Sequence, residues 1–157
     1  LNHTNAEIVI AGRSATAGEK VCARLGDRVQ FQLIDLATPD TLKAALADRN
    51  LVIHCAGPFH YRTQDVLSAC IAAGVNYVDV SDHPSYTRQM TALRPQAEAA
   101  GITAMINTGI FPGISNSMVR RDVEQLDSVD RIHLSYVVAG SGGAGATVMR
   151  TTFLGLQ

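Results

Sequence analysis

The sequence predicts an α/β protein built on a doubly wound parallel β-sheet. Apolar segments of strand length recur at spacings of roughly 20 to 27 residues, and segments with helical periodicity lie between them. The strand-like segments are rich in β-branched residues, as expected for strands that are buried on both faces of a sheet. This regular alternation of strand and helix is typical of βαβ units.

Five segments are predicted to form the strands of this sheet. Each combines the length and the β-branched content of a strand with polar, glycine or proline residues close to its ends. They are residues 7–11, 29–34, 51–55, 75–80 and 102–106.

Local signals place the helices between these strands. Thr38 and Thr63 are predicted N-caps, because a threonine hydroxyl can accept from the free N–H groups of a first turn. Gly74 and Gly101 are predicted C′ residues that end helices in the left-handed conformation. Pro95 is expected to divide the last of these segments into two helices, since the residue before a proline disfavours the α region.

Composition excludes several classes of function. The chain has 13 basic and 14 acidic residues and a net charge of −1, which argues against electrostatic binding to nucleic acid or to an anionic membrane. No apolar run reaches the roughly 18 residues of a membrane-spanning helix, and the N-terminus lacks a secretion signal. A cytoplasmic location is therefore expected.

Cysteine and histidine usage predicts neither disulfides nor a metal site. Cys22, Cys55 and Cys70 are odd in number and lack Cys-x-x-Cys spacing, so each is predicted to be a small buried hydrophobe. The five histidines show no spacing typical of zinc ligands.

The sequence pattern changes in the last third of the chain. Residues 113–126 are predicted to form a helix, and residues 131–138 then alternate between apolar and polar side chains. Such alternation is typical of a strand with one solvated face in an antiparallel sheet. We therefore predict a first domain over residues 1–127 and the start of a second, α+β domain over residues 128–157.

A glycine-rich run lies in an unexpected place. Residues 140–145 match Gly-x-Gly-x-x-Gly, the pattern of a dinucleotide-binding loop. That loop should follow a fully apolar strand and precede a ribose-binding residue by about 20 positions. The strand before it alternates, and only 12 residues follow it. We expect a flexible connection there instead.

Functional residues are expected beyond the carboxyl ends of the strands, where open α/β sheets bind their ligands. Arg13 and Ser14 follow the first predicted strand, where an arginine can accommodate the 2′-phosphate of NADP. Asp35 follows the second strand and could accept the adenine amino group, although it could also be an acid at a helix entry.

Later strand ends add further candidates. The turn Ala56-Gly57-Pro58-Phe59 has small residues that would let backbone approach a ribose or pyrophosphate. Residues 79–83 are unusually polar, and the helix beginning near Gly113 could hold an anion on free N–H groups.

Four motifs in the same order resemble the saccharopine dehydrogenase-like family. They are Ala11-Gly12-Arg13, the run from His54 to Phe59, the run from Cys70 to Asp79, and the run from Gly109 to Asn116. The resemblance implies an NADP-using oxidoreductase with an N-terminal Rossmann domain, followed by a catalytic and dimerisation domain. It implies hydride transfer at a C–N bond of an amino-acid-derived small molecule, with an enoyl reductase-like activity as the alternative.

The resemblance also implies roles for particular residues. Arg13 and Ser14 would bind the adenosine end of NADP, and Asp35 and Leu36 would bind adenine. Cys55, Ala56, Gly57, Pro58 and Phe59 would line the cofactor near its pyrophosphate and nicotinamide. Asp79 would lie near the nicotinamide and the substrate. Homodimerisation through the second domain is also implied.

The sequence departs from the family pattern at its start. The family begins with a strand, a glycine-rich loop and a helix, and none of these precedes residue 7. That first strand is central in the order 3-2-1-4-5-6. We therefore expect a fragment that lacks its first βα unit and binds NADP poorly or not at all on its own.

Asp79 is the predicted catalytic residue, and Asp82 and His83 are further acid–base candidates. A non-catalytic NADP sensor is the alternative to an enzyme, although the polar residues 79–83 favour an enzyme. A short-chain-reductase-like epimerase or dehydratase is not supported, because no tyrosine here has a lysine four residues later.

Overall fold

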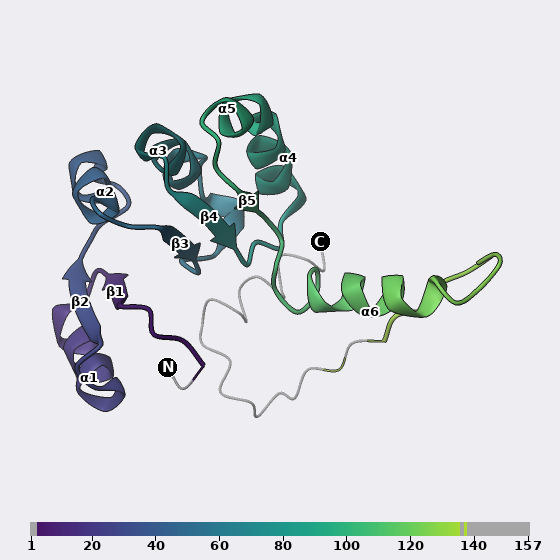
Figure 1. The fold of residues 1–157 in the computed structure, drawn as a ribbon, viewed down its shortest axis with the longest axis horizontal. Helices are drawn as coiled ribbons and strands as arrows, with labels where there is room; N and C mark the ends of the chain where they lie inside the picture. Colours follow the sequence, from purple (N-terminus) through teal and green to yellow (C-terminus); the bar gives the residue numbers. More distant parts are fainter. Residues whose placement is uncertain (1–2, 136, 138–157) are drawn as a thin grey trace. The chain divides into compact units, whose positions relative to one another are not determined.

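The computed structural model describes residues 3–135 and 137 (Figure 1). These residues belong to two compact units, one over residues 1–50 and the other over residues 51–157. The boundary predicted near residue 128 is a different division and stays a prediction.

The first unit is a βαβα arrangement. It consists of β1 (Ile8–Gly12), α1 (Ala15–Leu25), β2 (Val29–Leu33) and α2 (Pro39–Leu46). The two strands pair in parallel, with Ile8 opposite Val29 and Gly12 opposite Leu33. Helix α1 packs closely on this sheet, because Gly18 presents no side chain toward the ring of Phe31. Arg13 and Ser14 connect the end of β1 to the start of α1.

The second unit contains a three-stranded parallel sheet in the order β3-β4-β5. Figure 1 shows α3, α4 and α5 gathered on one face of this sheet. The elements are β3 (Leu51–His54), the 3-10 turn η1 (Phe59–Tyr61), α3 (Asp65–Ala73), β4 (Asn76–Asp79), α4 (Pro84–Ala92), α5 (Arg94–Ala99), β5 (Ala104–Met105) and α6 (Ile114–Val123).

The predicted fold class is confirmed. Each predicted strand is present within one or two residues of its expected ends, and every described strand pair is parallel. The pairings β1-β2 and β3-β4-β5 agree with the runs 2-3 and 4-5-6 of the order 3-2-1-4-5-6.

The core of the second unit lies between its sheet and α3 and α4. Tyr77 on β4 and Tyr86 on α4 have no exposed surface, and neither has Cys70 on α3. Burying such large rings contributes much of the apolar area that holds the helices on the sheet. As a result, the hydroxyl groups of both tyrosines lie in the interior.

The helix boundaries predicted from Gly74, Gly101 and Pro95 are confirmed. Gly74 and Gly101 have φ values of 68° and 69° and end α3 and α5, so the left-handed conformation predicted from sequence is present. The segment before Gly101 is divided at Leu93, and Pro95 lies in the first turn of α5. Thr63 does not cap α3, which begins at Asp65 after Gln64; its hydroxyl donates to the side chain of Asp65.

One sequence prediction is wrong in the described residues. Residues 131–135 and 137 form no strand, and Ile132, Leu134 and Val137 are between 50% and 90% exposed. An alternating segment becomes a strand only when a neighbouring strand bonds its backbone, and no described strand pairs with it. The glycine-rich run 140–145 lies outside the described residues.

The cysteine prediction also needs correction. Cys70 is fully buried, whereas Cys22 is half-buried and Cys55 is exposed. Cys55 lies just after β3, where the chain leaves the sheet, and its apolar neighbours in sequence do not enclose it. All three are free thiols.

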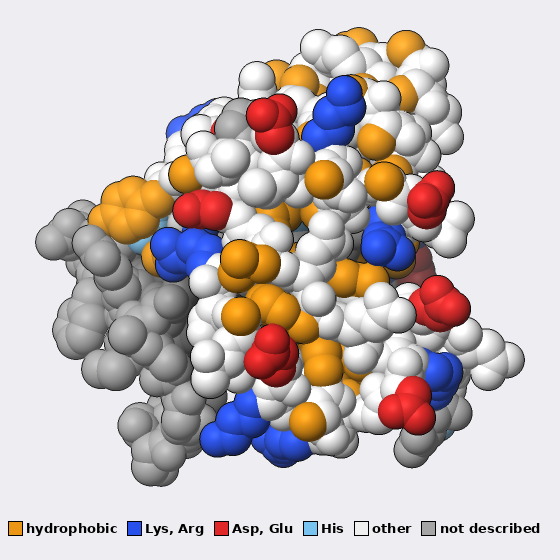
Figure 2. Space-filling view, turned by 90° about the vertical axis from the view of Figure 1, so that its left-hand side faces the viewer, with side chains coloured by type: hydrophobic (Ala, Val, Ile, Leu, Met, Phe, Trp, Pro, Cys, Tyr) orange, Lys and Arg blue, Asp and Glu red, His pale blue; other side chains and the backbone are white. Residues whose placement is uncertain are grey.

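Charges are dispersed on the surface. On the face displayed in Figure 2, basic and acidic side chains are interspersed among apolar and uncharged ones. This agrees with the near-zero net charge of the chain.

Candidate functional site

In the first unit, an exposed arginine lies at the start of a helix. Arg13 follows β1 directly and is exposed. Ser14 is the N-cap of α1, and its Oγ accepts from the N–H of Ala17 at 3.3 Å. The helix geometry leaves the N–H groups of Ala15 and Thr16 without partners inside the helix. A guanidinium, a hydroxyl and free N–H groups at a helix N-terminus form a donor set that fits a phosphate.

Asp35 follows β2 in the same unit. One oxygen of its exposed carboxylate, Oδ1, accepts from the N–H of Ala37 at 3.0 Å, and its carbonyl accepts from Thr38 and Thr41. These bonds fix the turn that leads into α2. Leu36 beside it is half-buried. Asp35 is therefore held in place with its side chain still accessible, as an adenine-binding acceptor requires.

In the second unit, the loop Cys55–Phe59 leaves the carboxyl end of β3. Cys55 and Ala56 are exposed, and Gly57 and Pro58 are half-buried and joined by a cis peptide bond. Arg62 fixes this loop through two hydrogen bonds. Its Nε donates to the carbonyl of Ala56 at 2.6 Å, and its Nη2 donates to the carbonyl of Gly57 at 3.2 Å.

Phe59 ends this loop but points inward. It is only 5% exposed, and its ring centre lies 5.2 Å from that of His54 and 5.1 Å from that of Tyr86. Of the five loop residues predicted to line the cofactor, Phe59 is therefore the one that is buried in this structure.

Asp79 lies at the carboxyl end of β4 and has no exposed surface. Its Oδ1 accepts from the N–H of Ser81 at 3.0 Å, from the hydroxyl of Ser81 at 2.6 Å and from the N–H of Asn107 at 2.9 Å. Its Oδ2 accepts from the hydroxyl of Tyr77 at 3.0 Å. These bonds compensate for burying a carboxylate. The catalytic role predicted for Asp79 stays a prediction, but the geometry favours action through its neighbours.

Three side chains meet at the hydroxyl of Tyr77. His54 Nδ1 and the hydroxyl of Tyr86 each lie 3.0 Å from it, in addition to the Asp79 carboxylate. Burial lowers the pKa of His54 to about 4, an effect that nearby Asp79 partly opposes and Arg62 reinforces. Burial also raises the pKa of Tyr86 to about 12 and raises that of Tyr77 further. The histidine and both tyrosines are therefore neutral at pH 7.

Asn107 extends this cluster to the carboxyl end of β5. Its φ of 59° lies in the left-handed region, which is uncommon for a residue with a side chain. Its Nδ2 donates to the carbonyl and hydroxyl of Ser81 and to the hydroxyl of Thr87. Thr108 donates through both its N–H and its hydroxyl to the carbonyl of Asp79. Asp79 thus joins the ends of β4 and β5.

The remaining acid–base candidates are more accessible. Asp82 is exposed and His83 is half-buried, with its Nδ1 2.7 Å from the hydroxyl of Ser85. The ring of His60 in η1 lies 5.7 Å from that of His83. No group of three or more metal-ligating side chains occurs among the described residues.

The expectation of an anion site at the start of α6 is wrong. The N–H groups of Ile114 and Ser115 already bond to the carbonyls of Gly109 and Ile110, and those of Asn116 and Ser117 bond to Gly113. The chain turns so tightly here that a Cβ at Gly113 would lie 2.1 Å from the carbonyl oxygen of Gly109. The backbone hydrogen bonds of this turn therefore occupy the N–H groups that an anion would need as donors.

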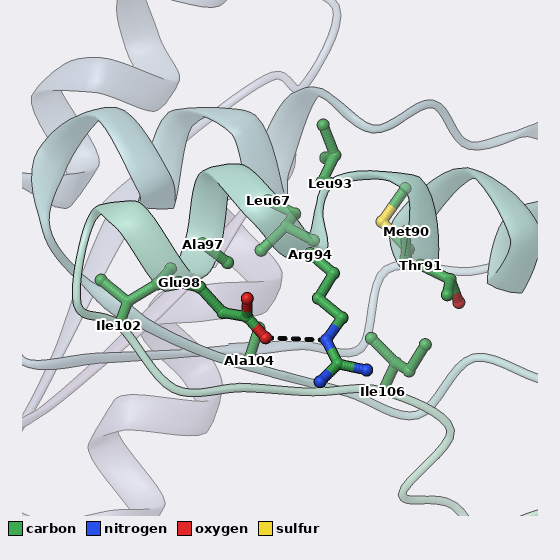
Figure 3. Close-up of a pocket in the computed structure, with 10 residues that line it drawn as sticks. All are labelled: Leu67, Met90, Thr91, Leu93, Arg94, Ala97, Glu98, Ile102, Ala104 and Ile106. Atoms are coloured by element: carbon green, nitrogen blue, oxygen red, sulfur yellow. Dashed lines mark hydrogen bonds and ion pairs between the residues drawn. The ribbon is translucent and has the colours of Figure 1, made fainter.

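A separate cavity of about 310 Å³ lies among α3, α4, α5 and β5 (Figure 3). Its lining is mainly apolar, and the exposed ion pair of Arg94 and Glu98, 2.7 Å apart, lies beside it. None of the residues predicted to bind cofactor or substrate lines this cavity.

Sequence reasoning missed three members of the buried cluster around Asp79, namely His54, Tyr77 and Tyr86. It also missed Arg62, which bonds to the adjacent loop. The polar atoms of the cluster meet only because β3, β4 and α4 pack together. His54 and Tyr77 lie in segments whose apolar pattern predicts strands, so no local signal marks them as polar site residues. None of the described helices has the length and apolar character needed to cross a membrane.

Comparison with protein families identifies one matching model. Residues 1–105 match the family described as "Saccharopine dehydrogenase NADP binding domain". Similar proteins include a probable mitochondrial saccharopine dehydrogenase-like oxidoreductase of Arabidopsis thaliana, 34% identical over 43% of this chain and 15% of its own length. The trans-acting enoyl reductase of Mycobacterium leprae is 29% identical over 97% of this chain and 40% of its own length.

A solved structure shares the fold. Apo saccharopine dehydrogenase (L-Glu forming) from Saccharomyces cerevisiae matches with a TM-score of 0.66 and 21% identity, over 77% of this chain and 26% of that one. The chain thus spans less than half the length of each of these relatives.

Proposed function

This chain belongs to the saccharopine dehydrogenase-like family through its NADP-binding domain, and we propose that it serves an NADP-dependent oxidoreductase in which Arg13 selects NADP over NAD. The observation that carries this proposal is the exposed Arg13 between the end of β1 and the N-cap of α1. The 2′-phosphate is the group that distinguishes NADP from NAD, and no carboxylate lies adjacent to Arg13 in sequence to bind a free 2′-hydroxyl instead.

We propose a matching group for each remaining part of the cofactor. Ser14 can donate its hydroxyl proton to the phosphate while its oxygen caps the helix. Asp35 and Leu36 would contact adenine. The exposed backbone of Cys55 to Pro58, fixed by Arg62, would approach the pyrophosphate and nicotinamide.

The bound nicotinamide supplies the hydride chemistry, and the protein supplies position and electrostatics. We propose a C–N bond of an amino-acid-derived small molecule as the site of hydride transfer. An enoyl substrate is the second candidate, since the Mycobacterium leprae relative is a trans-acting enoyl reductase and its match covers 97% of this chain. Of the acid–base candidates, Asp82 and His83 are the more accessible, whereas Asp79 is fully buried.

The test is a comparison of two cofactors with the full-length protein. Arg13→Ala should weaken NADPH binding by about 10- to 100-fold, the loss expected for charge-assisted hydrogen bonds to a phosphate, and should leave NADH binding nearly unchanged. Arg24→Ala, a change of another exposed arginine at the far end of α1, is the matched control. Equal losses for NADPH and NADH would contradict the role of Arg13.

A turnover assay then separates the substrate classes. Oxidation of NADPH with imines formed from amino acids and oxo acids would support the first candidate, and oxidation with enoyl thioesters would support the second. Binding of NADPH without turnover across both classes would favour a non-catalytic sensor.

A further inference from the structure

The buried cluster of the second unit has one open hydrogen-bonding position. His54 is 5% exposed, and its Nε2 has no hydrogen-bond partner among the described residues. Buried polar atoms are nearly always paired, because leaving one unpaired costs free energy. The other ring nitrogen, Nδ1, lies 3.0 Å from the hydroxyl of Tyr77 and 3.4 Å from that of Tyr86.

The hydrogen bonds around Tyr77 assign the proton on this histidine. The Asp79 carboxylate acts as an acceptor, so Tyr77 donates its hydroxyl proton to Oδ2. The oxygen of Tyr77 must then accept from its other two neighbours, 3.0 Å away in each case. Tyr86 therefore donates to Tyr77, and His54 donates from Nδ1. The ring is neutral, consistent with the lowered pKa of His54, so Nε2 carries a lone pair and no proton.

His54, whose Nε2 is the unpaired acceptor, directly precedes the loop that is proposed to bind NADP. His54 is the last residue of β3, and the loop Cys55–Phe59 follows it directly. The Phe59 ring meets the His54 ring edge-on, at an interplanar angle of 69°. Both tyrosine hydroxyls lie at the Nδ1 side of the imidazole, and the Phe59 side chain at the end of the loop packs against the ring.

We propose that Asp79, acting through Tyr77, is a positioning residue that presents His54 Nε2 as an acceptor for a hydroxyl or amide N–H of bound NADP, with Phe59 turning aside to admit it. This inference rests on the proposed cofactor function. It gives the fully buried Asp79 a role that requires no contact with substrate, and it explains why Nε2 of His54 has no hydrogen-bond partner among the described residues.

Nitrogen-15 NMR of the histidine side chains in the full-length protein tests which nitrogen of His54 carries the proton. The free protein should show His54 protonated at Nδ1 and unprotonated at Nε2. Tyr77→Phe should convert His54 to a mixture of tautomers, a change that a purely structural role of Tyr77 would not produce. A proton on Nε2 in the unaltered protein would overturn the proposal, and this measurement requires neither a variant nor bound cofactor.

Addition of NADPH tests whether His54 Nε2 accepts a hydrogen bond from the cofactor. The Nε2 resonance of His54 should shift as the site fills. Repeating the titration with 2′-phospho-ADP-ribose, which lacks the nicotinamide and its amide, identifies the donor: a shift with both ligands indicates a hydroxyl, and a shift with NADPH alone indicates the amide. NADPH binding that leaves the Nε2 resonance unmoved would overturn the inference while leaving the proposed cofactor function intact.

Two substitutions of His54 provide a matched pair. The amide of His54→Asn can still donate to Tyr77 but places nothing at the position of Nε2, whereas His54→Gln places an acceptor near that position. We expect His54→Asn to weaken NADPH binding by about fivefold, the effect of one neutral hydrogen bond, and His54→Gln to weaken it less. Equal affinities of both variants and the unaltered protein would contradict the proposal. Failure of the unaltered protein to bind NADPH would contradict the proposed function instead.

Discussion

Gly18 on α1 lies directly against the ring of Phe31 on β2. A Cβ placed on Gly18 would stand 1.9 Å from Cδ2 and 2.4 Å from Cγ of that ring, far inside contact distance. Because Cγ is close to the backbone, the ring cannot avoid the added methyl group by a small movement of its tip. The approach of α1 to its sheet, and with it the position of Arg13 and Ser14, therefore depends on this glycine.

Gly18→Ala should destabilise the protein by about 1 to 3 kcal/mol, even though alanine favours a helix, because overpacking outweighs the gain in helix propensity. Urea unfolding measures the effect. Glu19→Ala, at the exposed neighbouring position, should change stability by less than about 0.5 kcal/mol. An increase in the stability of Gly18→Ala would show that the helix is free to shift away from Phe31.

Tyr77→Phe should destabilise the protein by about 1 to 3 kcal/mol, because it leaves the buried Asp79 carboxylate with one donor fewer. Tyr86→Phe should cost less, since its hydroxyl bonds only to neutral groups of the cluster. Denaturant unfolding of both variants at pH 7 measures the difference. The reverse order would indicate that Tyr77 does not donate to Asp79.

Stability should fall as the pH decreases from about 6.5 to about 4. Burial lowers the pKa of His54 from 6.5 to about 4, so the unfolded chain binds more protons than the folded chain in this window. His54 contributes this stability fully above pH 6.5 and loses it as the pH falls, by up to about 3 kcal/mol.

His54→Gln isolates this contribution, because all other titrating groups remain. The difference in unfolding free energy between the unaltered protein and His54→Gln should shrink as the pH falls through this window. A difference that is constant between pH 7.5 and pH 4 would mean that His54 titrates normally in the folded protein.

Arg62→Ala should loosen the loop Cys55–Pro58, because Arg62 donates to the carbonyls of Ala56 and Gly57. We expect faster amide hydrogen exchange in this loop and a several-fold loss of NADPH affinity. Arg88→Ala removes an exposed arginine of α4 and serves as the control for lost charge. Unchanged exchange in the loop after Arg62→Ala would show that the backbone holds its own conformation.

Local patterns predicted the elements well because their causes are local. β-Branched residues place Ile8–Gly12 in a strand, alternation of apolar and polar residues places Val29–Leu33 in one, and the positive φ of Gly74 ends α3 as its sequence position suggests. The strand predicted at residues 131–138 failed because its formation depends on a partner strand, which local sequence does not specify. The positions of Arg13 and Asp35 beyond strand ends are predictable, since the ends of the two strands along the chain place them there.

The sequence by itself determined the α/β fold, the family and the exposed arginine that follows β1. Only the tertiary structure decided that Asp79 is fully buried and that its carboxylate is bound by Tyr77, Ser81 and Asn107. The physical reason is that fold class follows from periodicity within a few residues of chain. The environment of a carboxylate follows instead from groups up to 28 positions away, which packing alone brings within hydrogen-bond distance.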